Sequence, residues 1–296
     1  MNKQMNGLAT GYREAARDRM RRIAAETVEI AKRGSYVYRG ETIEIGEAQR
    51  HSEEDSLLIT PKRGAQIVQS LKIERPVTEN LRTDYRVVNE SAVKTVRDLA
   101  ANGAESIGLL NFASAKNAGG GFLNGANAQE ENLAATSGLY PSQLRHSGYY
   151  DANRASGTMM YTHHAIYSPD VVFFRDERFE LAAPPAYASV LTLPAVNYGQ
   201  VLLKGEDAAQ AKAVMLERMR LALAIFAEQG DRTLVLGAYG CGVFRNDPAE
   251  VASWWRRLLD GEGWAVHFDQ VIFAVLDRSK DSRTIRPFER IWGRSL

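Results

Sequence analysis

The chain has 296 residues, of which 45% are hydrophobic and 25% charged, and a formal net charge of +1. This length allows one large domain or two modest ones, with a sizeable core. The near-neutral balance argues against a dedicated nucleic-acid binder, which would carry a basic excess, but is compatible with a small anionic ligand. The single cysteine, Cys241, excludes an intramolecular disulfide framework and a cysteine-rich zinc site, and it fits a reducing compartment.

Targeting and metal-binding signals are missing from the sequence. The N-terminus has no apolar signal-peptide core, and no stretch approaches the roughly 20 apolar residues that span a bilayer. The five histidines form no HExxH pattern. We therefore expect a cytoplasmic protein that has no membrane contact and no resident metal.

The first 72 residues differ in pattern from the rest of the chain. Residues 9–33 have the spacing of a helix that ends at Gly34, with apolar or small residues at Met20, Ile23, Ala24, Val28 and Ala31. The alternation in "SYVYRGETIEI" predicts a hairpin, and a polar segment with one short helix after Pro61 follows. We expect residues 1–72 to form an extension packed on a main domain of residues 73–296.

From Asp84 onward strands alternate with helices. The expected strands are "YRVV", "SIGLLNFAS", "MYTHHAIYS" and "VVFFR" on either side of a Ser168-Pro169-Asp170 turn, "YASVLTLPAV", "RTLVLGAYG" and "QVIFAVLD". The expected helices begin at Ser91, near Ala128, at residue 207, at Asp247 and near residue 283. This order predicts an α/β fold whose mixed sheet is sandwiched between helices, with ligands at the carboxyl ends of the strands.

The first unusual loop follows "SIGLLNFAS". Three glycines, Gly119, Gly120 and Gly121, precede Gln129-Glu130-Glu131 by seven residues. One interpretation is helix capping, with Asn127 as N-cap, Glu130 as its reciprocal partner and both acids favoured by the helix dipole. The other is that the glycines let backbone approach a ligand while the helix start directs a carboxylate at it. The spacing alone leaves both open.

The second unusual loop, "LGAYGCGVFRNDP", follows another strand. It is either a strand-to-helix connection with Pro248 at the first helical position, or an anion cradle. In the cradle, backbone N–H groups converge on a diphosphate from Gly240, Cys241, Gly242, Val243 and Phe244. The loop matches neither a Walker A motif nor the GxGxxG fingerprint, which disfavours a hydride-transfer enzyme.

These stretches resemble a known family. "NFASAKNAGGG", followed by seven residues and "QEE", resembles the GGG-x(6–8)-QEE signature of poly(ADP-ribose) glycohydrolases of the shorter bacterial type. "YGCGVFRNDP" resembles the family's diphosphate-binding loop, and "IYSPDVVFFR" and "PAVN" are similar to further family segments. The resemblance covers about residues 85 to 290. It implies a macrodomain fold that binds ADP-ribose.

The resemblance also implies an activity. Glu131 would be the catalytic acid and base, and Glu130 would hold the ribose hydroxyls, in hydrolysis of the ribose–ribose O-glycosidic bonds of poly(ADP-ribose). ADP-ribose would be released mainly from chain ends, without a cofactor. The partners would be poly(ADP-ribose) or ADP-ribosylated macromolecules. The alternatives are a mono-ADP-ribosyl or O-acetyl-ADP-ribose hydrolase, and a non-catalytic ADP-ribose-binding macrodomain, which would not need the acid pair.

Three further residues have two interpretations each, one functional and one structural. Asn117 either hydrogen-bonds the distal ribose or shapes a turn, and Phe244 either packs on that ribose or belongs to the core. Glu90 either accepts a hydrogen bond from the adenine amino group or is a first-turn helix acid. We expect Asn111 to line the strand-end loop and Gln129 to position the acid pair.

Other candidates carry no assigned role. Cys241 has no adjacent histidine, which argues against a nucleophile. His163 and His164 are expected on a strand. Larger family members use a tyrosine-bearing flap over adenine, and neither Tyr149, Tyr150 nor Tyr161 can be placed there.

Overall fold

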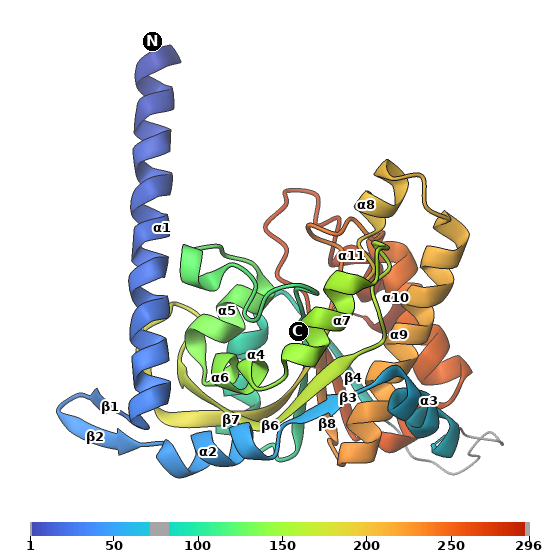
Figure 1. The fold of residues 1–296 in the computed structure, drawn as a ribbon, viewed down its shortest axis with the longest axis horizontal. Coiled ribbons are helices and arrows are strands. Elements are labelled where there is room, and N and C mark those ends of the chain that lie inside the picture. The colour runs from blue at the N-terminus through green and yellow to red at the C-terminus, as the bar shows by residue number, and fades with distance from the viewer. Residues whose placement is uncertain (1, 72–82, 294–296) are drawn as a thin grey trace.

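A seven-stranded mixed sheet runs through the computed structural model, which describes residues 2–71 and 83–293 (Figure 1). The strand order is β3-β6-β7-β5-β8-β9-β4. In chain order the strands of this sheet are β3 (Leu57–Ile59), β4 (Asp84–Val88), β5 (Ile107–Phe112), β6 (Ala165–Arg175), β7 (Leu181–Leu193), β8 (Thr233–Leu236) and β9 (Gln270–Ala274). Five neighbouring strands, from β7 to β4, are parallel, so their carboxyl ends meet at one edge.

The β6 strand corrects one expectation. Residues 165–175 form a single strand that pairs antiparallel with both β3 and β7, not two strands around a turn. The Ser168-Pro169-Asp170 segment is a bulge, where the register with β7 shifts and Asp170 has a φ of 43°. A bulge accommodates the proline, which has no N–H to donate, and pairing on both sides keeps the strand continuous.

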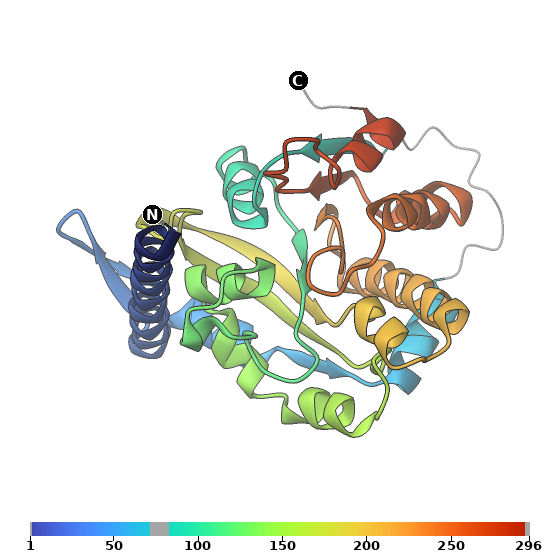
Figure 2. The same ribbon diagram turned by 90° about the horizontal axis from the view of Figure 1, so that it is seen from above.

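Helices cover both faces of the sheet, which confirms the predicted fold class (Figure 2). They are α1 (Asn2–Arg33), α2 (Gly46–Glu54), α3 (Pro61–Ser70), α4 (Ala92–Ala101), α5 (Gln129–Thr136), α6 (Leu139–Leu144), α7 (Ser147–Ala155), α8 (Tyr198–Leu203), α9 (Ala208–Gln229), α10 (Pro248–Arg256) and α11 (Arg286–Trp292). The short turns are η1 (Phe122–Asn124), η2 (Arg257–Gly261) and η3 (Trp264–His267). Among the described helices, none has the length and apolar character that crossing a membrane requires.

Alternation along the strands builds two cores. In β5, Leu110 faces the core under α9 and α10, whereas Leu109 faces the core under α4 and α5. Neither leucine has any exposed surface. Burial on both faces is typical of parallel strands between helical layers and explains the continuous apolar run of "IGLLNF".

The first seventy residues are joined to the main sheet. Helix α1 begins at Asn2 rather than at residue 9, and the predicted hairpin forms between β1 (Ser35–Tyr38) and β2 (Glu41–Glu44). The β3 strand then adds to the sheet edge through β6. The expected boundary between residues 72 and 73 lies outside the described residues, so this domain division stays a prediction. Figure 1 shows α1 upright beside α5, with its N-terminal turns extending past the other helices.

Candidate active site

Glu131 lies on the first turn of α5, which is hydrogen-bonded to the carboxyl end of β5. Its side chain is half-buried, and each oxygen accepts one backbone hydrogen bond. Oε1 accepts from the N–H of Gly121 at 2.9 Å and Oε2 from the N–H of Ala128 at 3.1 Å. Two donors from different sides fix the carboxylate in one orientation.

The helix start differs from the expected one by one residue. The N-cap of α5 is Ala128, and Glu131 supplies the carboxylate that returns to the N-cap N–H. The expectation that Asn127 caps the helix with Glu130 as its partner is therefore wrong. The physical reason is that Glu130 points into the protein instead, where Asn111, Gln143 and the N–H of Ser114 donate to it.

Glu130 is the buried member of the acid pair, with 3% of its surface exposed. Oε1 accepts from the side-chain amides of Asn111 and Gln143, at 3.2 and 3.0 Å, and Oε2 accepts from the N–H of Ser114 at 2.6 Å. Burial raises the pKa of Glu130 to about 8; the three donated hydrogen bonds oppose this shift and the charge of Glu131 adds to it. The carboxylate ties α5 to the end of β5 and to α6.

The glycine triplet makes room for the carboxylates and for a buried ring. Gly119 and Gly120 have positive φ, 62° and 59°. A Cβ on Gly120 would lie 2.4 Å from Oε1 of Glu131, and one on Gly119 would lie 2.6 Å from the ring of Phe122. Both positions therefore require glycine on backbone and packing grounds. At Gly121 the nearest neighbour is the Cβ of Ala126, at 3.0 Å.

Two amide side chains next to the acids are used for positioning. Gln129 accepts from the N–H of Phe112 and donates to the carbonyl of Leu110, both at 2.8 Å, and so joins α5 to β5. Asn111 is fully buried and donates to Glu130 and Thr192, while its Oδ1 has no partner in the described chain.

The second loop presents free backbone donors. In the part of the chain that the structure describes, the N–H groups of Gly242, Val243 and Phe244 have no hydrogen-bond acceptor. The Val243 side chain is 82% exposed and nothing lies within 4 Å of a Cβ on Gly242, whereas one on Gly240 would lie 2.6 Å from the Cβ of Ala195. The N–H of Cys241 donates to the carbonyl of Ala238 at 3.1 Å, so the expectation that it belongs to the cradle is wrong. Three consecutive free amides in an open loop suit an anion.

The other side chains of this loop are less accessible. Cys241 is half-buried, and burial raises the pKa of its thiol, which disfavours a thiolate. The ring of Phe244 packs 6.2 Å from that of Tyr161. Asp247, with Pro248 after it, caps α10 by accepting from the N–H groups of Ala249 and Glu250, which confirms the expected start of that helix.

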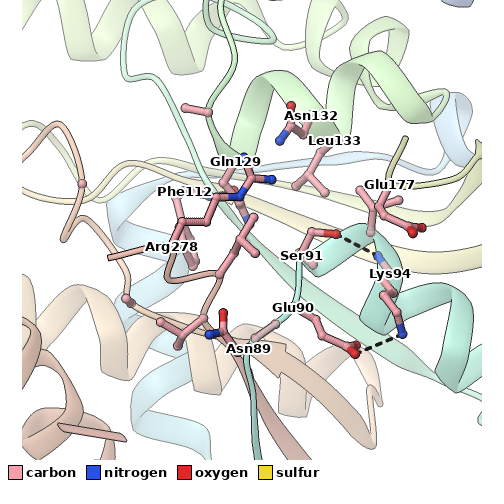
Figure 3. Close-up of a pocket in the computed structure, with 18 of the residues that line it drawn as sticks. Asn89, Glu90, Ser91, Lys94, Phe112, Gln129, Asn132, Leu133, Glu177 and Arg278 are labelled. Carbon is pink, nitrogen blue, oxygen red and sulfur yellow. Dashed lines mark hydrogen bonds and ion pairs between the residues drawn. The ribbon is translucent and has the colours of Figure 1, made fainter. Parts of the chain in front are cut away.

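A cavity of about 780 Å³ joins the two loops (Figure 3). Its wall includes the first turns of α4 and α5, the end of β9 and the start of the second loop. Of the binding residues predicted from the sequence, Glu90, Gln129, Cys241 and Gly242 line it, and the helix-start residues Ser91 and Asn127 do so as well. Glu131 shares the α5 turn with Ala128, Gln129 and Asn132 of the wall without itself lining it. A space of this size suits a nucleotide-sized ligand.

Glu90 stands on the cavity wall opposite α5 in Figure 3. Its carboxylate forms an ion pair with Lys94 at 3.1 Å, one turn along α4. Ser91 caps the same helix by accepting from the N–H of Lys94. Glu90 precedes the N-cap Ser91, and the first turn of α4 contains no acid, so its interpretation as a first-turn helix acid is wrong. Its place on the cavity wall leaves the adenine contact as a prediction.

Some functional candidates were missed in the sequence. Gln143 joins the N–H of Gly119 to Glu130, and Phe179 and Arg278 line the cavity from the β6–β7 turn and the segment after β9. No local spacing connects these residues to the glycine loop. The one available signal for Gln143 is a polar side chain in a short helix that also holds apolar residues, and it does not identify a partner.

Other residues lie away from the cavity. Asn117 is exposed, and its backbone carbonyl accepts from the N–H of Gly120. Tyr149 and Tyr150 are core residues, with 0% and 4% exposure, so neither is a flap. His163 and His164 precede β6 rather than lying on it, which corrects the expected strand position. Among the described residues, no three His, Cys, Asp or Glu side chains gather as metal ligands would.

The protein has a mixed sheet covered by helices, a carboxylate pair at the start of α5 and a loop with free amides, and a cavity lies beside both at the carboxyl edge of the parallel strands. These features are typical of enzymes that bind nucleotide ligands. The comparisons make this specific. Residues 24–176 match the family model of the microbial-type PARG catalytic domain. The chain therefore belongs to this family, and it is a glycohydrolase.

Solved structures agree with the family assignment. The poly(ADP-ribose) glycohydrolase (PARG) of Thermomonospora curvata is 36% identical with a TM-score of 0.87, over 92% of this chain and 99% of that one. The same enzyme bound to the inhibitor ADP-HPD gives 36% and 0.85, over 93% and 99%. The Deinococcus radiodurans PARG in complex with ADP-ribose is 40% identical with a TM-score of 0.77, over 84% and 98%. No curated protein matches.

Proposed function

We propose that the protein hydrolyses the ribose–ribose O-glycosidic bonds of poly(ADP-ribose) and releases ADP-ribose, with Glu131 as general acid and base. The observation that carries this proposal is the double backbone anchorage of Glu131 by Gly121 and Ala128, beside a nucleotide-sized cavity. Family membership, and the ADP-ribose and ADP-HPD complexes of the bacterial relatives, support the choice of substrate.

The chemistry needs one carboxyl group that acts twice. Glu131 first donates a proton to the leaving ribose oxygen and then removes one from the attacking water. The transition state resembles an oxocarbenium ion, so the negative charges of the diphosphate and of the Glu131 carboxylate, which ionises as it gives up its proton, stabilise it. Glu130 orients α5 through the three hydrogen bonds that it accepts, and its proposed ligand contact is with the ribose hydroxyls. Gln129 and Asn111 hold the same helix start.

The remaining ligand contacts follow from the loops. The diphosphate accepts hydrogen bonds from the amides of Gly242, Val243 and Phe244. The distal ribose packs on the Phe244 ring and forms a hydrogen bond with Asn117. The adenine amino group donates to Glu90 on the far wall of the cavity. We further propose that the fold is a macrodomain, that cleavage proceeds mainly from chain ends, and that the protein acts in the cytoplasm without nucleic-acid or membrane binding.

One assay separates this proposal from its alternatives. Labelled, auto-modified polymer is incubated with the protein, and the products are resolved by size. The proposal expects free ADP-ribose and progressive shortening of the polymer. Binding of ADP-ribose with an intact polymer would instead identify a non-catalytic reader. Release of only the protein-attached unit, or cleavage of O-acetyl-ADP-ribose alone, would identify one of the other hydrolases.

A further inference from the structure

Helix α1 packs on the loop that follows the glycine triplet. Phe122, the first residue of η1, is 2% exposed and lies in one apolar cluster with Met20, Ile23 and Ala24 of α1. The same cluster includes Ala134 of α5. The N-terminal helix therefore contacts both segments that position Glu131, although it begins more than 100 residues earlier in the chain.

Arg17 of α1 contacts the end of η1. Its Nε donates to the carbonyl of Asn124 at 2.8 Å, at the end of η1. A Cβ on the next residue, Gly125, would lie 2.4 Å from the carbonyl oxygen of Arg17, and Gly125 has a φ of 74°. The loop backbone thus rests directly on the helix backbone, and only glycine permits that contact.

A second contact holds the far end of the same unit. Thr27 is 2% exposed, and its hydroxyl donates to the carbonyl of Ala135 at 2.8 Å, in the last turn of α5. Thr27 also accepts from Nε of Arg175 at 3.0 Å. Helix α1 therefore binds the segment from η1 to the end of α5 at both of its ends.

A short series of hydrogen bonds connects Arg17 to the carboxylate of Glu131. Gly121 accepts at its carbonyl from the N–H groups of Asn124 and Ala126, which closes the turn that Arg17 holds. The N–H of the same Gly121 donates to Oε1 of Glu131. A shift of η1 away from α1 moves this donor, and the carboxylate loses one of its two anchors.

We propose that Arg17 is a positioning residue for the reaction, holding the η1 turn against α1 so that the Gly121 amide fixes Glu131. The inference rests on the proposed function, in which Glu131 is the acid and base. The N-terminal helix then affects the geometry of the chemical step. It should not affect ligand binding, because the diphosphate loop and the part of the cavity wall that includes Glu90 are built from other elements.

The test compares three full-length variants, Arg17→Ala, Arg17→Lys and Arg21→Ala, in polymer cleavage, ADP-ribose binding and thermal unfolding. Arg21 lies on the same helix and pairs with Asp18, so it controls for loss of a surface arginine. We expect Arg17→Ala to lower kcat about tenfold, since a displaced catalytic group is costly, with KM and the Kd for ADP-ribose unchanged. Arg17→Lys retains a donor and recovers most of the rate, and Arg21→Ala matches wild type.

Several results would overturn the inference. They are a wild-type kcat for Arg17→Ala, an equal loss in Arg21→Ala, or a loss in Arg17→Ala that appears only in the unfolding temperature. No recovery in Arg17→Lys also counts against it. Failure of the proposed function is distinguishable, because the wild-type protein itself would then release no ADP-ribose from the polymer.

Discussion

Gly120 and Glu131 are so close that any side chain at position 120 would occupy the place of the carboxylate. A Cβ there would lie 2.4 Å from Oε1 and 3.0 Å from the carboxyl carbon of Glu131. The same residue has a φ of 59°. The glycine is therefore required both by the backbone conformation and by the position of the acid.

Gly120→Ala is expected to lower kcat about a hundredfold, because the methyl group displaces Glu131 from its two backbone donors. We also expect a loss of about 1–2 kcal/mol in the free energy of unfolding from the strained φ. Steady-state kinetics and denaturant titration measure the two effects. Gly261→Ala is the matched control, since nothing lies within 4 Å of a Cβ there and its φ is not positive. Equal kinetics in both variants would contradict the role given to this contact.

Gly242→Pro removes one of the three free amides of the second loop. We expect it to raise the Kd for ADP-ribose about tenfold, since a hydrogen bond to a charged group is lost, and to leave adenosine binding nearly unchanged. Calorimetric titration with both ligands measures the difference. Gly242→Ala retains the N–H and has free space around its Cβ, so it should bind both ligands like wild type. If proline has no effect on ADP-ribose, the anion-cradle assignment fails.

Phe179 lines the cavity from the β6–β7 turn, where its φ is 69°. We expect Phe179→Ala to weaken ADP-ribose binding by about tenfold through lost contact with the adenine moiety. Phe179→Leu retains apolar contact and should weaken it less. Binding of both variants that equals wild type would place adenine elsewhere. Tyr187→Ala, at a 42% exposed aromatic residue outside the cavity, is the control.

Asp231 should make stability depend on pH. It is 3% exposed, and burial raises its pKa to about 7 from 3.8, while a hydrogen bond from Tyr167 at 2.9 Å opposes the shift. Between these two values the unfolded chain is ionised and the folded protein holds the proton, so the free energy of unfolding falls as pH rises. In Asp231→Asn, the decrease in the free energy of unfolding between pH 4 and pH 7 should be smaller by a few kcal/mol at most. Denaturant titration over this pH range measures it. An unchanged slope would show that the carboxyl group is ionised in the folded protein.

Most of the fold could be predicted from the sequence, because local signals and tertiary structure agree. Ser91 and Asp207 cap their helices, and the nearly continuous apolar runs of the central parallel strands reflect burial on both faces. The prediction failed at Pro169, where Ser-Pro-Asp has the chemistry of a turn. Pairing with β3 and β7 outweighed that local preference, and the proline became part of a bulge.

The candidate site was predictable in its residues but not in its contacts. The glycine triplet and the acid pair mark the site, yet nothing in their spacing shows that Gly119 faces Phe122 or that Glu130 meets Gln143. A shift of one residue in the helix start exchanged the capping role between the two acids. Contacts made by α1 and by Phe179 depend on how distant elements pack, which local sequence does not encode.

Glu131→Gln provides the most direct test of the central claim. The amide retains the shape of the side chain but is too weak an acid to protonate the leaving oxygen and too weak a base to activate water, so we expect polymer cleavage to fall by about a thousandfold. The Kd for ADP-ribose should stay within about twofold of wild type, because the proposed diphosphate and adenine contacts lie on other elements. A Glu131→Gln variant that releases ADP-ribose from poly(ADP-ribose) at the wild-type rate would contradict the assignment of Glu131 as the acid and base.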